Sequence, residues 1–88
     1  MNLENVELQF AHIFRSEGET LIEIRIFKGP YHHAAIFDTR GNILEELVDA
    51  SQMGLAGKQL EIFKSRYRQN ARAFAADVVR ERITPCLN

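Results

Sequence analysis

Residues 58–83 read KQLEIFKSRYRQNARAFAADVVRERI, and this stretch decides the fold. Its apolar side chains recur at steps of three and four residues, for example at Leu60, Phe63, Tyr67, Ala71 and Phe74. That spacing gathers them on one face of an α-helix, as in helices that pack against a core. The sequence therefore predicts one long C-terminal helix over residues 58–83, lying on another layer of structure.

The stretch before this helix alternates between apolar and polar side chains, which is typical of half-buried strands. Alternation runs through residues 5–15 and again through residues 20–28, with turn-forming residues between them. Gly29-Pro30 interrupts the pattern, and residues 32–38 form a third candidate strand. The prediction is an α+β domain: a three- or four-stranded antiparallel β-meander packed by the C-terminal helix.

Residues 43–53 fit two structures. As a strand, residues 43–48 would complete a hairpin and add a fourth strand to the meander. As a helix, Asn42 would cap the N-terminus, Glu45 would complete a capping box and Gly54 would end the helix. A short helix or extended arm is slightly favoured, because the polar residues that follow suit a helix or loop better than a strand.

Length and composition indicate a small soluble protein. The chain has 88 residues, one cysteine and a formal net charge of −1, which predicts a single domain over residues 1–88. At this size only about 60 to 65% of the unfolded surface can be buried, so oligomerisation is a common source of added stability. The lone Cys86 fits a reducing compartment, and no apolar run approaches the roughly 20 residues of a membrane span. We expect a cytoplasmic protein.

Charge is distributed unevenly along the chain. The first 57 residues hold four basic and nine acidic side chains, whereas residues 58–88 hold seven basic and three acidic ones. Such a division indicates either attraction between the helix and the sheet, or a surface for nucleic acid or an acidic protein.

No set of residues indicates catalysis or metal binding. The imidazoles are those of His12, His32 and His33. The last two are adjacent on a predicted strand and point to opposite faces, so they cannot readily bind one metal together. Nothing in the sequence activates Cys86 or the serines as nucleophiles. We therefore expect a non-enzymatic protein without catalytic residues, metal or cofactor.

The predicted helix is longer than the predicted strands. Twenty-six residues of helix would span about 39 Å, whereas an eight-residue strand spans about 27 Å. The helix should then overhang the sheet with its apolar stripe uncovered, and find cover in a second copy or another protein. The predicted function is a protein-interaction module, either a homodimer or a regulatory or inhibitory protein. Its predicted interface consists of Tyr67, Arg68, Arg72, Phe74, Val78, Arg80, Arg82 and Ile83.

An alternative comes from the segment Ala50-Ser-Gln-Met-Gly54-Leu55, followed by Leu60 and Phe63. A small residue, a glycine at the turn and apolar residues beyond it resemble a helix-turn-helix over residues 46–63. The resemblance implies a nucleic-acid-binding protein whose second helix reads base edges from its N-terminal end. The residues assigned to nucleic acid in this alternative are Lys58, Gln59, Lys64, Arg66, Arg68 and Arg72.

Overall fold

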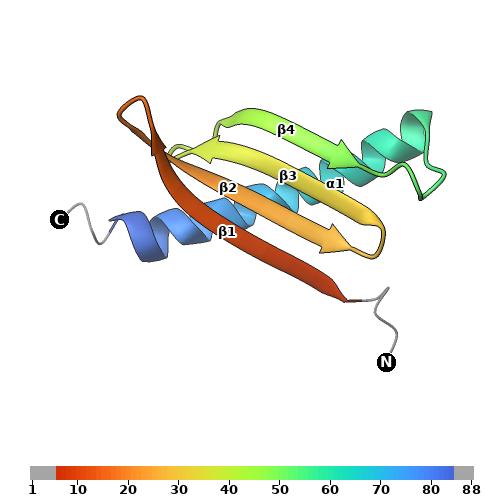
Figure 1. Ribbon diagram of the computed structural model, residues 1–88, viewed down its shortest axis with the longest axis horizontal. Helices are drawn as coiled ribbons and strands as arrows, with labels where there is room; N and C mark the ends of the chain where they lie inside the picture. The colour runs from red at the N-terminus through yellow and green to blue at the C-terminus, as the bar shows by residue number, and fades with distance from the viewer. Residues whose placement is uncertain (1–5, 85–88) are drawn as a thin grey trace.

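The computed structural model describes residues 6–84 and shows a four-stranded sheet with one helix against it (Figure 1). The strands pair antiparallel in chain order and are Glu7–Ser16 (β1), Glu19–Lys28 (β2), Tyr31–Asp38 (β3) and Ile43–Asp49 (β4). A C-terminal helix, Gly57–Val78 (α1), continues into a π-helical turn, Val79–Ile83 (η2). The predicted α+β fold, an antiparallel meander packed by one long C-terminal helix, is confirmed.

The preference for a helix or arm at residues 43–53 is wrong, because Ile43–Asp49 forms β4. β4 pairs with β3, and Leu44 is an extra residue between the pairs Phe37–Ile43 and Ile36–Glu45. This β-bulge breaks the strict alternation of a strand. The bulged sequence therefore reads like one turn of helix, although its backbone follows β3.

β1 and β2 form a hairpin with ten matched residue pairs. Ser16 and Glu19 close it, and the two residues between them have positive φ: 52° at Glu17 and 83° at Gly18. Two successive left-handed residues define a type I′ turn, whose twist matches that of antiparallel strands. The turn therefore continues the pairing of β1 and β2 without a break.

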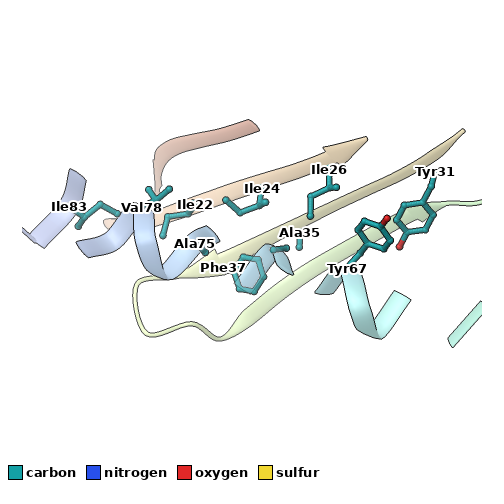
Figure 2. Packing of buried hydrophobic residues seen from close by; sticks show 11 residues of the cluster. Ile22, Ile24, Ile26, Tyr31, Ala35, Phe37, Tyr67, Ala75, Val78 and Ile83 are labelled. Carbon is teal, nitrogen blue, oxygen red and sulfur yellow. The ribbon is translucent and has the colours of Figure 1, made fainter. Parts of the chain in front are cut away.

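The core lies between the sheet and the helix (Figure 2). Alternate residues of β2, Ile22, Ile24 and Ile26, are fully buried against the helix. The helix presents Tyr67, Ala71, Ala75 and Val78 to them, a spacing of three and four residues. The two alanines let the helix backbone approach the sheet closely. The other buried members of this cluster are Tyr31, Ala35, Phe37 and Ile83.

The expectation that the end of the helix leaves its apolar stripe uncovered is wrong. Val78 and Ile83 are only 2% and 7% exposed. The helix crosses the sheet diagonally and its last turns pass beneath the β1–β2 hairpin (Figure 1), whose strands have ten residues each. A helix that lies diagonally across ten-residue strands is covered over more of its length than a helix that lies along the eight-residue strand assumed from the sequence. Within residues 6–84, no helix combines the length and hydrophobicity needed to cross a bilayer.

Candidate interaction surface and a buried polar network

The apolar residues of the predicted helix interface lie mostly inside the molecule. Tyr67, Val78 and Ile83 belong to the core, and Phe74 is half-buried against it. These side chains already have intramolecular cover. A partner that bound the helix would therefore meet its outer side, which is mainly polar but includes the exposed Ile62.

The arginines predicted around that interface have several different surroundings. Arg68 is held by a carboxylate of β4, and the guanidinium of Arg72 donates a 3.4 Å hydrogen bond to the carbonyl of Gly41. Arg80 pairs with Asp77 one turn earlier, and Arg82 is exposed. Arg68, Arg72 and Arg80 thus make polar contacts within the chain.

The residues predicted to bind nucleic acid also differ from one another in exposure and in their contacts. Lys58, Gln59 and Arg66 are exposed, whereas Lys64 pairs with Glu61 at 3.6 Å. The helix-turn-helix resemblance over residues 46–63 is wrong, because residues 46–49 belong to β4 rather than to a first helix. The exposed basic residues thus lie on the outer side of a helix that packs on a sheet.

His32 and His33 point to opposite faces of β3, as strand alternation predicts. His33 is buried on the helix side and is 1% exposed, while the ring of His32 stacks on Phe27 at 4.3 Å. Within the described part of the chain, Nε2 of His32 is buried without a hydrogen-bond partner. His12 stacks on Phe14 on the same side of the sheet as His32.

A chain of hydrogen bonds links β3, β4 and the helix through four side chains. The two ring nitrogens of His33 lie 2.6 Å from Oη of Tyr31 and 3.0 Å from Oε2 of Glu46. Arg68 donates to both carboxylate oxygens of Glu46, at 2.7 and 2.8 Å. This bidentate pair is the strong form of an arginine–carboxylate contact. The network joins the edge strand β4 to the helix.

The pKa shifts identify which partner holds each proton. The hydrogen bonds from Arg68 lower the pKa of Glu46 to about 2, with a smaller contribution from His33. Burial lowers the pKa of His33 below its ordinary value of 6.5, although its hydrogen bond to Glu46 acts in the opposite direction. Burial, together with the charge of Glu46, raises the pKa of Tyr31. At neutral pH the group therefore contains a carboxylate, a neutral imidazole and a phenol.

One arrangement of protons satisfies every contact in the network. A charged Glu46 can only accept, so Nε2–H of neutral His33 donates to it and Nδ1 is left as an acceptor. The hydroxyl of Tyr31 then donates to Nδ1. His33 and Tyr31 are 1% and 0% exposed, so a substrate cannot reach the imidazole without local opening. The network can fix the position of β4, and its imidazole and phenol are closed to solvent.

The face of the sheet opposite the helix, here called the open face, is unusually apolar. Residues that pair across strands share a face, and one row across this face is Phe10, Arg25, Ala34 and Leu47. The neighbouring row includes Leu8, Phe27 and His32. Leu8, Phe10 and Leu47 are 50%, 54% and 68% exposed. An antiparallel sheet with one wet side normally carries polar residues there.

Aromatic rings continue across three strands of the open face. Phe10 of β1 meets Phe27 of β2 edge to face at 5.9 Å, and Phe27 in turn stacks on His32 of β3. Such contacts hold large side chains in defined positions before any partner arrives. The open face is therefore a preformed surface.

Charged residues on the open face are mainly acidic. Glu23 and Arg25 pair with each other at 3.2 Å near its centre, and Glu45 lies beside them on β4 in the row of Glu23. These residues line a hollow with Ala34 and Leu47. The surface thus combines an apolar area with an excess of carboxylates.

Sequence reasoning did not select this face, although a signal for it was present. In residues 8–14 both alternating sets of side chains are mainly apolar: Leu8, Phe10 and Phe14 on one face, Ala11 and Ile13 on the other. A strand apolar on both sides is typical of one covered on both sides. Comparison with protein-family models, curated protein sequences and solved structures finds no match for this chain.

Proposed function

We propose that this protein is a non-enzymatic, cytoplasmic interaction module that binds another protein through the open face of its sheet. The observation that carries the proposal is the exposure of Leu8, Phe10 and Leu47 on a face with no covering layer within residues 6–84. Large apolar side chains exposed on one face of a sheet indicate an interaction site in soluble proteins. A regulatory or inhibitory role is consistent with such a module.

The charges of the open face define the chemistry of the partner. Glu23 and Glu45 outnumber Arg25 in the centre of the face, and Arg25 already pairs with Glu23. A partner with an apolar centre and a basic rim would bury the exposed side chains and offset the remaining carboxylate charge. We therefore infer a basic-rimmed protein surface as the ligand.

Nucleic-acid binding by the basic helix is less well supported. Arg68 is committed to Glu46 and Lys64 pairs with Glu61, which leaves fewer cations for phosphate. A nucleic-acid surface would also lose affinity steeply as the salt concentration rises. The absorbance ratio of the purified protein at low salt separates this alternative from the proposal.

The proposal is tested by a charge placed on the open face. Leu47→Lys introduces an ammonium at a position that is 68% exposed, and Ile62→Lys does the same on the helix at a position that is 63% exposed. Immobilised wild-type protein and both variants are incubated with cell extract, and bound proteins are quantified by mass spectrometry. We expect at least one protein to be retained by wild type and Ile62→Lys and lost, by about tenfold or more, with Leu47→Lys.

The bound protein is then mapped by chemical-shift changes in labelled wild-type protein. Shifts confined to the open-face rows of β1 to β4 would support the proposal. Equal retention by all three proteins, or loss with Ile62→Lys alone, would contradict it and return attention to the helix.

A further inference from the structure

The two edges of the sheet differ in how they are protected. β4 carries Glu45, Glu46 and Asp49 as well as a bulge, which are the usual obstacles to pairing with another strand. β1 pairs with β2 over ten residues without interruption, and residues 8–14 contain no charged residue, proline or glycine. An edge strand of this kind is a template for further pairing.

The hairpin turn decides which backbone groups of β1 face outward. A two-residue turn makes Ser16 and Glu19 a hydrogen-bonded pair. Such pairs alternate along an antiparallel ladder, so the even-numbered residues of β1 bond to β2. The odd-numbered residues, among them Gln9, Ala11 and Ile13, direct their N–H and C=O groups away from the sheet.

We propose that β1 pairs antiparallel with β1 of a second copy of this chain, about a two-fold axis at Ala11. In this register Glu7 of each copy lies opposite Arg15 of the other, which gives two ion pairs. On the open face, Leu8 lies opposite Phe14, and Phe10 lies opposite His12. The strand is therefore complementary to itself in charge and in apolar character.

Neighbouring registers lack this complementarity. An axis at Phe10 moves Arg15 past the start of the other β1, so that the basic side chain loses its acidic partner. An axis at His12 places Glu7 opposite Glu17, a repulsive pair. Only the axis at Ala11 pairs both charged ends of β1 favourably.

The side chains that would pair are accessible in the monomer. Glu7 and Arg15 are exposed. Arg15 makes hydrogen bonds of 2.8 Å to the carbonyl of Gly18 and 3.4 Å to Thr20 within its own turn. Exposed contacts of this kind contribute little to stability, so Arg15 can turn to a carboxylate across the interface at small cost.

The helix of each copy would lie partly below the sheet of the other. Its C-terminal end emerges beyond β1 in Figure 1, and the two-fold axis would place that end beneath the start of the other β1. There, on the helix side of the sheet, Glu7 and Gln9 are exposed. The paired sheets would form one continuous sheet with both helices on the same side, and the two open faces would become one surface.

The proposal is tested by exchanging the two charges. Sedimentation equilibrium of the full chain is measured for wild type, Glu7→Arg, Arg15→Glu and the double variant. We expect a wild-type dimer, an increase in its dissociation constant of about tenfold in each single variant because both ion pairs become repulsive, and recovery in the double variant. Single variants that dimerise as wild type does, or a double variant that fails to recover, would overturn the register.

A second measurement locates the interface independently of the charges. In the dimer, the amide hydrogens of Gln9, Ala11 and Ile13 should exchange slowly, and at dilutions that favour monomer they should exchange quickly. The amides of Phe10 and His12, bonded to β2, serve as internal controls that stay protected in both. A wild-type monomer throughout the micromolar range, or a dimer whose odd-numbered amides exchange freely, would overturn the proposal. The Leu47→Lys test does not depend on this outcome.

Discussion

At the level of single residues, Glu46 connects three elements of the fold. It belongs to β4, and its carboxylate accepts from His33 of β3 and from Arg68 of the helix. Its partners lie 13 and 22 residues away in sequence. A change at this one position therefore alters contacts in three elements at once.

Replacing Glu46 by glutamine should lower the free energy of unfolding at pH 7 by about 2 kcal/mol. The variant keeps the shape of the side chain but leaves Arg68 without its counter-charge. The expected loss of free energy is smaller than that for breaking a fully buried ion pair, because the Arg68 side chain is 32% exposed. Urea unfolding followed by circular dichroism measures the change. Glu45→Gln, at the exposed neighbouring position on the opposite face, is the matched control and should change little. Equal effects of the two substitutions would show that the network contributes nothing specific.

These contacts also show what the sequence could and could not predict about single residues. The opposite orientations of His32 and His33 follow from strand alternation and were predictable. The hydrogen bonds of His33 were not, because Glu46 and Arg68 come near it only after β4 pairs with β3 and the helix crosses both. Glu46 was instead interpreted as part of a helix or arm.

At the level of elements, the strands and the helix with a regular periodicity are predictable from the sequence. The strand whose periodicity is interrupted is not. The first three strands and the helix have clear periods of two and 3.6 residues, and their predicted positions agree with the structure to within two residues. β4 was misread because the bulge at Leu44 shifts its alternation by one position. The open face was missed because a length argument directed attention to the helix end, whereas the exposed apolar side chains lie on the strands.

The burial of the helix end gives a prediction that separates core from interface. Val78→Ala should lower the free energy of unfolding by about 2 kcal/mol, because it leaves a cavity between the helix and the sheet. Val79→Ala changes the half-buried neighbouring residue and should lower the free energy of unfolding by a smaller amount. Urea unfolding and sedimentation at one fixed concentration measure the two effects. A Val78→Ala protein of unchanged stability but weaker self-association would restore the helix interface that the sequence suggested.

At the level of the whole molecule, acid should weaken the fold through the buried network. Glu46 has a pKa of about 2 in the folded protein against an ordinary value of 4.5, so its contribution is complete above pH 4.5 and is lost as the pH falls toward 2. His33, with a pKa below 6.5 in the folded state, remains neutral while the unfolded chain takes up a proton. His33 therefore also makes the free energy of unfolding fall as the pH falls, and this loss begins below about pH 6.5.

The measurement is the free energy of unfolding as a function of pH for wild type and Glu46→Gln. Between pH 4.5 and 2 the wild type should lose about 2 kcal/mol more than the variant, because the shift at Glu46 is discounted for the partial exposure of its pair with Arg68. Parallel curves for the two proteins over this range would contradict the assignment of a charged Glu46 to the network.

The bulge and carboxylates of β4 limit how far the proposed assembly can grow. A molecule in which both edge strands could pair would add copies at both edges and form an open-ended assembly, as in fibrils. Within residues 6–84 the sheet has one such edge, β1, and pairing about a two-fold axis occupies this edge in both molecules at once. The bulged, acidic edge strand β4 thus blocks further pairing, and the assembly is limited to a dimer.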